Sequence, residues 1–435
     1  MSGTLETPGP SATLYANPVE VPGPSQAVFN APFYTCTRNF YVNASTGNDG
    51  NRGTQAAPWQ SIDAGDAAVQ PGDCINVAAG TYPAVNLQHG GNLASASGYV
   101  VYRCQTMDAC RITTNVQFAK PVSLAANYLV VDGFELDCAN NTGFIGIATG
   151  TDSVGINAHH LWLLNSIVHD CKQSGLAWDH SDWHWIIHNT FYGNSSGMCG
   201  IFGSGLSIWE PQVVAGYIPT AADNAWAPFH IVIEWNVSHD NNNPQTNCTG
   251  NTDGNGIILD SWEVSTPPYE QSALVLGNLT YHNGGRGIQV LNTQHATVAN
   301  NTAYHNNWDN LIIGTFRGEI YLQSVGNSTV INNIAISNTA TNPRNTPFLG
   351  QLALSATNSW ANNISFGAGN NFGAPDSFPA TSNQVGVDPM LVNITGGNFA
   401  LQAGSPAIGY AQPQPFIPSW MTDAGACHSS LTTCP

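Results

Sequence analysis

Residues that could perform acid–base chemistry gather between positions 172 and 286 of this 435-residue chain. Asp253 and Asp260 flank an apolar run, and Arg286 follows in a glycine-rich stretch of similar pattern. Neighbouring carboxylates can bind a cation or serve as acid and base, and a basic side chain can remove a proton from carbon. We therefore predict a catalytic site, whose candidate catalytic residues are Arg286, Lys172, His282, Asp253 and Asp260.

Two further sets of residues would complete this site. Calcium prefers several oxygen ligands, and the candidate metal ligands are Glu210, Asp253, Asp260 and Glu263. Aromatic faces stack on sugar rings, and the candidate substrate-binding residues are Trp209, Trp226, Trp262, Gln289 and Arg317. Structural alternatives stand beside these roles. Arg286 could form a surface salt bridge, and Asp253-Gly254 is an ordinary turn dipeptide.

The composition restricts the class of ligand. The chain has 27 acidic and 9 basic residues, a net charge of −18, and only 8% charged residues. Nucleic acid binding requires lysine and arginine to displace counterions, and anionic membranes attract basic segments. The charge balance therefore argues against both partners. It fits a neutral or cationic ligand, or an anionic ligand held through a metal.

The cysteines predict an oxidising compartment. There are ten of them, an even number, and disulfides persist in secreted proteins. Sequence alone does not fix the connectivity, but short loops could close Cys104/Cys110 and Cys427/Cys434. The candidate pairs for the remaining cysteines are Cys36/Cys74, Cys138/Cys171 and Cys199/Cys248. No apolar run reaches the roughly 20 residues of a membrane span. We expect a secreted protein, extracellular or periplasmic, and a monomer by default.

A short unit recurs from about residue 128. It reads apolar, Asn, apolar or small residues, His or Asp, a glycine-containing turn, then an alternating apolar strand, with a period of roughly 23 to 31 residues. Coils of a β-solenoid stack about 4.8 Å apart, so equivalent residues form columns. The predicted asparagine ladder is Asn165, Asn189, Asn236, Asn278, Asn301, Asn333 and Asn363. A second column would contain His169, Gly193, Asp240, His282 and His305.

Aligning the coils on the glycine before each strand brings the candidate residues together. The aligned positions are Gly175, Gly205, Gly256, Gly287 and Asn310, and the outward column four residues later reads Asp179, Trp209, Asp260, Leu291 and Gly314. On this alignment, Glu210, Asp253 and Asp260 lie within about two coil spacings of Arg286.

Both ends of the repeat resemble a known superfamily. Phe40-Tyr-Val-Asn, Pro58-Trp-Gln-Ser-Ile and the segment 69–82 resemble the opening coils of extracellular β-helix proteins, and segments 387–393 and 398–409 resemble their C-terminal ends. Residues 40–410 are similar to the pectate-lyase-like superfamily. The resemblance implies an all-β fold, a right-handed parallel β-helix built as a single-stranded solenoid, with a short capping helix at Ser61–Ala68.

The expected organisation has three parts. Residues 1–33, rich in Pro, Ser and Ala, would form an extended arm or linker. Residues 34–412 would form the β-helix, with an insertion near 211–229 that could carry a binding wall. Residues 413–435 would form a disulfide-closed tail.

Within the superfamily, several activities remain open, because fold does not fix function. The sequence favours a secreted carbohydrate-active enzyme, a calcium-dependent lyase that cleaves a uronic-acid polysaccharide by β-elimination. The alternatives are an inverting glycoside hydrolase with a carboxylate pair, a C5-epimerase suggested by the acidic and histidine-rich segment 178–184, and a non-catalytic carbohydrate-binding spike.

Overall fold

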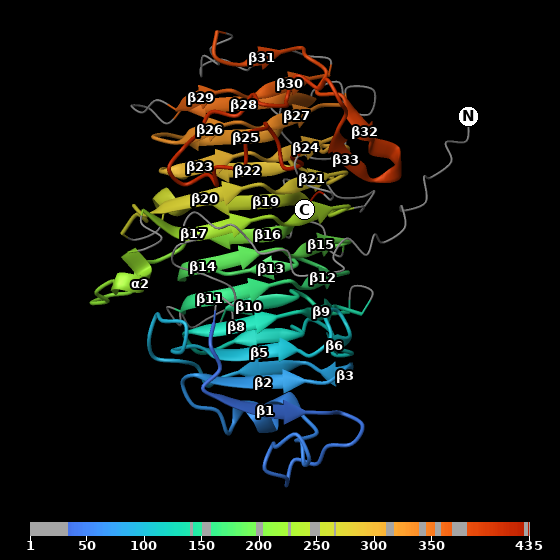
Figure 1. Cartoon of the computed structure of the whole chain (residues 1–435), viewed down its shortest axis with the longest axis vertical. Coiled ribbons are helices and arrows are strands. Elements are labelled where there is room, and N and C mark those ends of the chain that lie inside the picture. The colour runs from blue at the N-terminus through green and yellow to red at the C-terminus, as the bar shows by residue number, and fades with distance from the viewer. Residues whose placement is uncertain are drawn as a thin grey trace.

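The chain winds into a right-handed helix of stacked coils (Figure 1). Successive coils add one strand at a time to each of three parallel sheets. The computed structural model describes residues 34–139, 142–149, 158–196, 203–224, 228–243, 253–264, 267–309, 317–338, 345–352, 358–367, 381–429 and 434. The fold is the parallel β-helix that the sequence resemblance implied. The 1–33 arm, Trp226 and the Cys199/Cys248 pair lie outside the described residues.

The sheets are numbered by the order in which the chain visits them. Sheet 1 consists of β1 (Arg38–Val42), β2 (Asp73–Val77), β5 (Val100–Cys104), β8 (Leu129–Asp132), β11 (His159–Leu164), β14 (Asp182–Ile187), β17 (Phe229–Glu234), β20 (Ser272–Leu276), β23 (Ala296–Ala299), β26 (Thr329–Ile331) and β29 (Ser359–Ala361). Sheet 2 consists of β3 (Gly80–Pro83), β6 (Cys110–Thr113), β9 (Phe134–Asp137), β12 (Ile167–His169), β15 (Thr190–Tyr192), β18 (Val237–His239), β21 (Leu279–Tyr281), β24 (Thr302–Tyr304), β27 (Ile334–Ile336), β30 (Ile364–Phe366) and β31 (Gln384–Val385). Sheet 3 consists of β4 (Val85–Leu87), β7 (Val122–Leu124), β10 (Ile147–Thr149), β13 (Leu176–Ala177), β16 (Ser204–Trp209), β19 (Asn255–Asp260), β22 (Ile288–Leu291), β25 (Arg317–Val325) and β28 (Asn345–Leu352).

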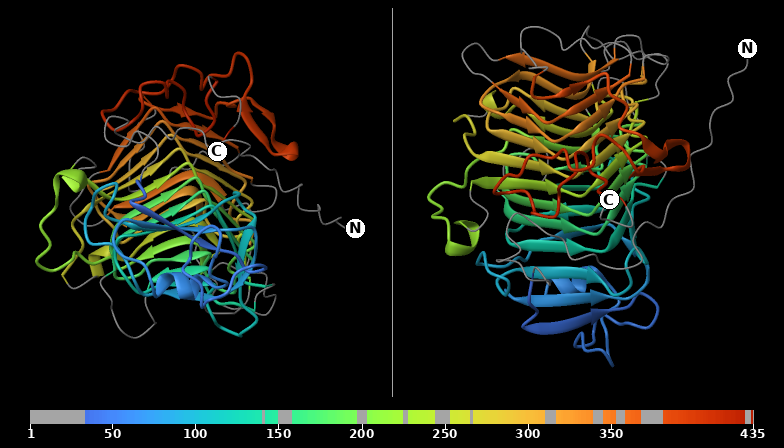
Figure 2. Two further views of the ribbon diagram at one scale, coloured as in Figure 1. Left: turned by 60° about the horizontal axis from the view of Figure 1, so that its bottom comes forward. Right: turned by 45° about the horizontal axis from the view of Figure 1, so that its top comes forward.

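Few other elements interrupt the coils. The short helix α1 (Ile62–Asp66) is capped by Ser61, whose Oγ accepts from Ala64 N at 3.1 Å, so the predicted capping helix is confirmed. The remaining elements are α2 (Ala221–Asn224), the 3₁₀ turns η1 (Trp262–Val264) and η2 (Ile394–Gly396), and the antiparallel pair β32 (Leu391–Asn393) and β33 (Asn398–Leu401). Figure 2 shows β32 and β33 beside the stack rather than in it.

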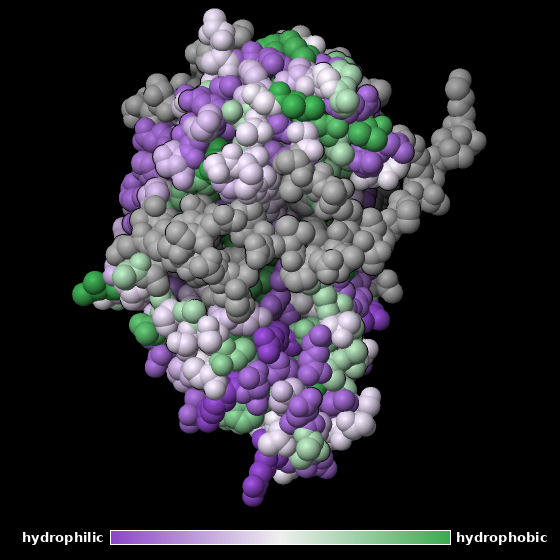
Figure 3. Space-filling model, in the orientation of Figure 1, coloured by the Kyte–Doolittle hydropathy of each residue, from purple (hydrophilic) through white to green (hydrophobic). Residues whose placement is uncertain are grey.

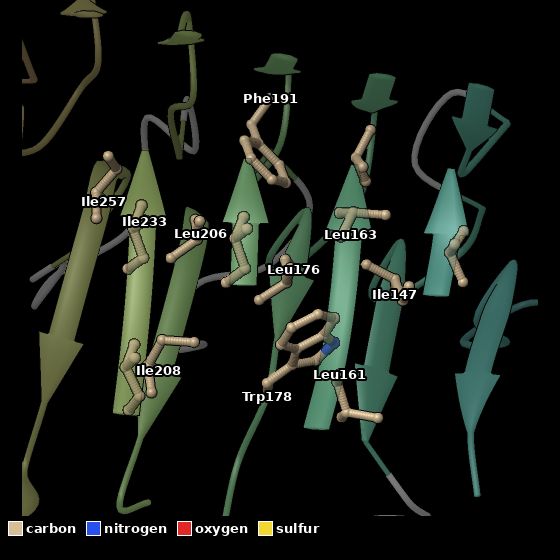
Figure 4. Close-up of a cluster of buried hydrophobic side chains, with 14 of the residues drawn as sticks. Ile147, Leu161, Leu163, Leu176, Trp178, Phe191, Leu206, Ile208, Ile233 and Ile257 are labelled. Carbon is tan, nitrogen blue, oxygen red and sulfur yellow. The ribbon is translucent and has the colours of Figure 1, made fainter. Parts of the chain in front are cut away.

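Alternating strand residues fill the interior with aliphatic side chains. Leu161, Leu163, Leu176 and Ile233 are fully buried and point into the space between the sheets, with Trp178 among them (Figure 4). Because each coil buries its apolar face only against its neighbours, the core is a continuous column. Outside, hydrophilic and hydrophobic residues are interspersed over the described part of the face in Figure 3.

An asparagine ladder runs through the turn between sheets 1 and 2, as predicted. Each amide oxygen accepts from the backbone N and the side chain of the rung below, at 2.8–3.0 Å, along Asn189, Asn236, Asn278, Asn301, Asn333, Asn363 and Asn383. The expected rung Asn165 was wrong. The register pairs Leu164 with Ile187, so Ser166 meets Asn189, and Asn165 donates to Asp132 instead.

A second ladder, which was not predicted, follows sheet 2. Its rungs are Asn194, Asn241, Asn283 and Asn306, and it ends where Asn306 N and Nδ2 donate to Glu319 Oε2 at 3.0 and 2.7 Å. The aligned glycines make room for it, because a Cβ at Gly287 would lie 2.6 Å from Asn306 Nδ2. In the next coil Glu319 takes the glycine position, since Ile288 pairs with Ile320.

That register corrects one further alignment. The predicted fifth coil began at Asn310 and placed Gly314 in the outward column, and both residues lie outside the described part of the chain. The strand that follows β22 in sheet 3 is instead β25, which places Tyr321 and Gln323 beside Gln289 and Leu291. The glycine rule failed there because Glu319 replaces the glycine.

Four of the predicted disulfides are present: Cys36–Cys74, Cys104–Cys110, Cys138–Cys171 and Cys427–Cys434. The segment after β33 packs along the side of the helix. Gly425 N donates to Asn332 O, Ala426 N donates to Thr302 Oγ1, and Trp420 stacks on Trp235 with ring centroids 5.6 Å apart. This segment therefore covers part of the outer surface of sheets 1 and 2.

Candidate functional site

The outer rim of sheet 3 carries the largest share of the predicted site residues. Trp209 and Asp260 are register partners on β16 and β19, and Glu210 N donates to Asp260 O at 3.0 Å. His180 contacts Glu210 and Trp209. Its Nε2 lies 3.4 Å from Glu210 Oε2, and its ring packs edge-on against the Trp209 ring with centroids 4.9 Å apart. Trp209 remains 37% exposed. An open aromatic side chain therefore stands beside Asp260 and Glu210.

Asp253 lies immediately before β19 and is only partly exposed. Its Oδ1 accepts from Asn255 Nδ2 at 3.2 Å. Burial, reinforced by the charge of Asp260, raises the pKa of Asp253 to about 7, although Arg286 and Asn255 oppose the shift. Burial also raises the pKa of Asp260, with Glu210 adding to the effect and Ser261 opposing it. The rim thus holds a carboxyl group poised to exchange a proton near neutral pH.

Arg286 lies in the next coil beside Asn255, close enough for its charge to influence the pKa of Asp253. Gly285 N donates to Gly254 O at 2.8 Å, and Arg286 N donates to Asn255 Oδ1 at 2.9 Å. The guanidinium carbon is 5.6 Å from the centre of the Tyr321 ring, and the residue is 5% exposed. Burial lowers the pKa of Arg286 against the influence of Asp253. Asn255 therefore contacts both Asp253 and Arg286, and Tyr321 contacts Arg286, although neither was predicted as a site residue. Their positions in the coil register are the feature of the sequence that could have identified them.

Other predicted residues lie away from this group. Lys172 is two coils from Asp253, and its ammonium lies 4.9 Å from the ring centre of Phe118, toward the N-terminal end. His282 lies beside Tyr281 and Tyr304, at 5.6 and 5.9 Å between ring centroids, on the side of sheet 2. Neither is brought into contact with Asp253 by the interactions of the described residues.

Three predicted substrate-binding residues are inaccessible. Trp262 is fully buried in the core, and its Nε1 donates to Ile208 O, so it cannot stack on a sugar. Gln289 is 3% exposed and donates to Gln323 Oε1 at 3.1 Å. Arg317, at the start of β25, is 2% exposed and donates to Asp309 O at 2.7 Å.

The predicted calcium ligands do not form a ready cage. Among the described residues, the one group of three or more ligand side chains whose atoms lie within 4.8 Å of one another is Glu135, Asp137 and His169. The carboxyl group of Asp260 influences those of Asp253 and Glu210 through charge alone, without a shared hydrogen bond among the described residues. Glu263 has no described contact with them. Calcium requires six to eight oxygen ligands at 2.3–2.6 Å. The residues present therefore do not fit calcium as arranged, and no step is assigned to it.

The Glu135–Asp137–His169 group is already neutralised by protein charges. His169 Nδ1 lies 2.9 Å from Asp170 Oδ2, and His169 Nε2 lies 3.2 Å from Glu135 Oε1. Burial lowers the pKa of His169, but these two carboxylates outweigh it and raise the pKa overall. Arg111 pairs with Asp137. A metal would have to displace Arg111 and break the hydrogen bonds of His169, so we interpret the group as a charge and hydrogen-bond network.

The predicted column that began with His169 is shifted by one residue. His169 pairs with Tyr192, so Asp170 takes the place beside Gly193, Asp240, His282 and His305, all with φ between 50° and 64°. His169 instead begins a stack with Tyr192, His239 and Tyr281, whose centroids are 4.7–5.4 Å apart. The rings cover one another's faces, which leaves edges rather than a sugar-binding platform.

Similar solved structures include pectate lyase Pel9A (16% identity, 91% of this chain and 97% of that chain, TM-score 0.48) and XylC in complex with xylose (12%, 81% and 87%, 0.44). A third is an alginate lyase from Paenibacillus sp. (15%, 75% and 98%, 0.37). No family model and no curated protein matches the sequence. These likenesses concern architecture and carry no argument about the reaction.

A search of the described helices finds none long and apolar enough to span a membrane.

Proposed function

We propose that this chain is a secreted carbohydrate-active enzyme that cleaves a uronic-acid polysaccharide by β-elimination at the outer rim of sheet 3. The observation that carries the proposal is that Arg286 and Asp253 lie on adjacent coils and that each influences the pKa of the other. Burial lowers the pKa of the first group and raises that of the second to about 7. An environment that brings the pKa values of a base and an acid toward neutrality is characteristic of acid–base catalysis.

Each partner has one role in the reaction. Arg286, in its neutral form, removes the proton on the carbon next to the substrate carboxylate. The electron pair forms a carbon–carbon double bond, and the glycosidic carbon–oxygen bond breaks. Asp253, in its protonated form, donates a proton to the leaving oxygen. Trp209 offers an exposed ring against which a sugar can stack.

A second candidate reaction is hydrolysis with inversion. The coupling of Asp253 and Asp260 favours it, because the charge of Asp260 helps to keep Asp253 protonated. In that reaction Asp253 protonates the leaving oxygen and Asp260 activates a water molecule. Arg286 would then have no proton to remove from carbon.

The deciding experiment incubates the protein with a panel of uronic-acid and neutral polysaccharides. Elimination leaves an unsaturated sugar that absorbs in the ultraviolet, whereas hydrolysis leaves new reducing ends without that absorbance. We expect ultraviolet absorbance to rise, and Arg286→Ala to slow the rise by about 10²–10⁴-fold, the usual contribution of a general base. Arg52→Ala, at an exposed arginine far from the rim, is the matched control and should leave the rate unchanged.

Three results would count against the proposal. Reducing ends without ultraviolet absorbance, lost in Asp260→Asn, would establish hydrolysis. Cleavage that persists at the wild-type rate in a folded Arg286→Ala protein would remove Arg286 from the mechanism. Absence of any cleavage across the panel would favour the non-catalytic spike.

A further inference from the structure

A second group of titratable side chains lies where the insertion after β16 meets the first residues of strands β11 and β14 in sheet 1. Figure 1 shows α2 beside the ends of β14 and β17, well away from the centre of the stack. Asp223 of α2 and His160 of β11 are both fully buried, and His160 Nε2 lies 2.9 Å from Asp223 Oδ1. The neighbouring His159 is 7% exposed, and its Nδ1 lies 2.6 Å from His160 Nδ1.

The backbone is distorted to make this arrangement. His160 has φ of 59°, in the left-handed region, and it drops out of the pairing in which His159 meets Asp182 and Leu161 meets His184. A non-glycine residue in this conformation costs about 1–3 kcal/mol and tends to occur at functional sites. The distortion lets two consecutive imidazoles face each other through their Nδ1 atoms.

The hydrogen bonds fix where the protons lie. Asp223 Oδ2 accepts from Thr220 N at 2.6 Å and from the Tyr217 hydroxyl at 2.5 Å. Burial raises the pKa of Asp223, but its hydrogen bonds to His160, Tyr217 and Thr220 outweigh burial and lower it overall. Asp223 is therefore a carboxylate and can only accept, so His160 carries its proton on Nε2.

The tautomer of His160 then determines that of His159. Burial lowers the pKa of His160, and burial with the charge of His160 lowers the pKa of His159 to about 4, so both rings are neutral at pH 7. A neutral His160 that is protonated on Nε2 has a lone pair on Nδ1. The short contact between the two Nδ1 atoms must then contain the proton of His159. Nε2 of His159 is left with a lone pair and has no hydrogen-bond partner among the described residues.

We propose that Asp223, His160 and His159 form a proton relay, which presents Nε2 of His159 as a proton acceptor toward a hydroxyl group of a carbohydrate bound beside the insertion. When Nε2 accepts a proton, the proton on Nδ1 of His159 passes to Nδ1 of His160. The positive charge then rests on His160, next to the Asp223 carboxylate. The hydroxyl that loses the proton is left as an oxyanion, so protons and charges balance, and the positive charge lies beside the buried Asp223 carboxylate.

The surroundings favour a ligand that donates hydrogen bonds. Asp182, the register partner of His159, is fully buried, and its Oδ1 accepts from Trp183 N at 2.9 Å and from His230 Nδ1 at 3.0 Å, and also from the Tyr269 hydroxyl. Its Oδ2 has no partner in the part of the chain that the structure describes. Asp182 Oδ2 is too deeply buried for a ligand to reach, so the lone pair of His159 is the acceptor for which a sugar hydroxyl can supply a donor.

Aromatic rings border the His159 end of the relay. The ring of Tyr128 lies 5.0 Å and that of Tyr217 lies 5.6 Å from the ring of His159, centroid to centroid. Rings that surround a polar group are typical of sugar-binding sites. The choice of a carbohydrate rests on the proposed function, whereas the relay itself stands without it.

The relay can be tested without any substrate. Nitrogen-15 NMR of histidine-labelled protein, with the His159 signals assigned through His159→Gln, should show a proton on Nδ1 and none on Nε2 at pH 7. Diethylpyrocarbonate reacts with the unprotonated nitrogen of histidine. Carbethoxylation of His159, followed by peptide mass spectrometry, should therefore have a rate that is flat from pH 5 to 8, whereas in urea-unfolded protein it should fall below the ordinary pKa of about 6.5.

Two variants separate the relay from simple packing. In Asp223→Asn the amide can donate to His160 Nε2, which reverses both tautomers and protonates His159 Nε2, so we expect at least about tenfold slower carbethoxylation at pH 7. Tyr217→Phe, which keeps the carboxylate, should stay within about twofold of wild type. A folded Asp223→Asn protein that reacts at the wild-type rate would overturn the relay. So would a wild-type Nε2 proton, and that measurement still decides if Asp223→Asn does not fold.

The ligand class has its own test. Pools of acidic oligogalacturonides and of neutral cello-oligosaccharides are added before the reagent. Protection of His159 by either pool supports a carbohydrate at this position. If neither pool protects His159, the carbohydrate assignment is refuted. Because reactivity is read on His159 and cleavage on Arg286, failure of one proposal leaves the other visible.

Discussion

Replacing Asn278 by Ala tests how much the first asparagine ladder contributes to the stability of the fold. Asn278 is fully buried, and its Oδ1 accepts from Asn236 N and Asn236 Nδ2, both at 2.9 Å. Its own Nδ2 donates to Ile233 O and Asn301 Oδ1 at 2.9 Å. The alanine variant removes all of these bonds at once.

The cost comes mainly from the groups left behind. Asn236 N and Asn236 Nδ2 lie in a fully buried turn that water cannot reach. A buried donor left unsatisfied costs about 1–3 kcal/mol, so two of them cost about 2–6 kcal/mol. We expect a loss of about 4 kcal/mol, a large part of the 5–15 kcal/mol typical of a folded domain.

Urea unfolding, monitored by circular dichroism, measures this loss as a shift of the midpoint at constant m-value. The matched control is Asn86→Ala, at an exposed position on β4, which should lie within about 0.5 kcal/mol of wild type. If Asn278→Ala cost no more than Asn86→Ala, the ladder would be a consequence of coil stacking rather than a source of stability.

Two further predictions concern buried carboxyl groups. Burial raises the pKa of Glu319 from 4.5 to about 7. Its contribution to stability is therefore complete below about pH 4.5 and is lost as pH rises to about 7, on the order of 3 kcal/mol. The urea midpoint should fall over this range, and an equal fall in Glu319→Gln would contradict the assignment. Glu234, fully buried between Ile187 and Leu276 with neither oxygen partnered among the described residues, should give a Glu234→Leu variant about 1 kcal/mol more stable. A lower urea midpoint in that variant would refute this.

The fold could be predicted because each coil of a solenoid repeats the same residue pattern at a regular spacing in the sequence. The recurring Asn before an apolar residue and a hydroxyl residue, as at Asn236 and Asn278, marks one fixed turn of each coil. Six of the seven predicted rungs are in the ladder. Asn165 failed because a neighbouring serine, Ser166, occupies the rung. A one-residue shift cannot be seen when both residues are small and polar.

The site could be predicted only in part, because pattern gives position and not burial. The strand register places Asp253 and Arg286 before β19 and β22 and Asp260 at the end of β19, so their convergence in one site stays a prediction. Trp262 looked exposed in the sequence, but the chain turns inward at η1 and buries it. The relay between Asp223 and His160 joins residues 63 positions apart across an insertion, and no periodic pattern reports such a contact.

The second ladder gives a physical reason why chemistry would concentrate on these coils. Its rungs Asn241, Asn283 and Asn306 lie in the turns that lead into β19, β22 and the β25 coil, and the ladder ends at Glu319. Those same turns carry Asp253 and Arg286. A network of buried amides fixes backbone positions more firmly than apolar packing does, because each rung has one geometry that satisfies its donors. A base and an acid on adjacent coils must keep their separation to within about 0.5 Å to work together. The ladder therefore supplies the rigidity that the proposed acid–base pair of Asp253 and Arg286 requires.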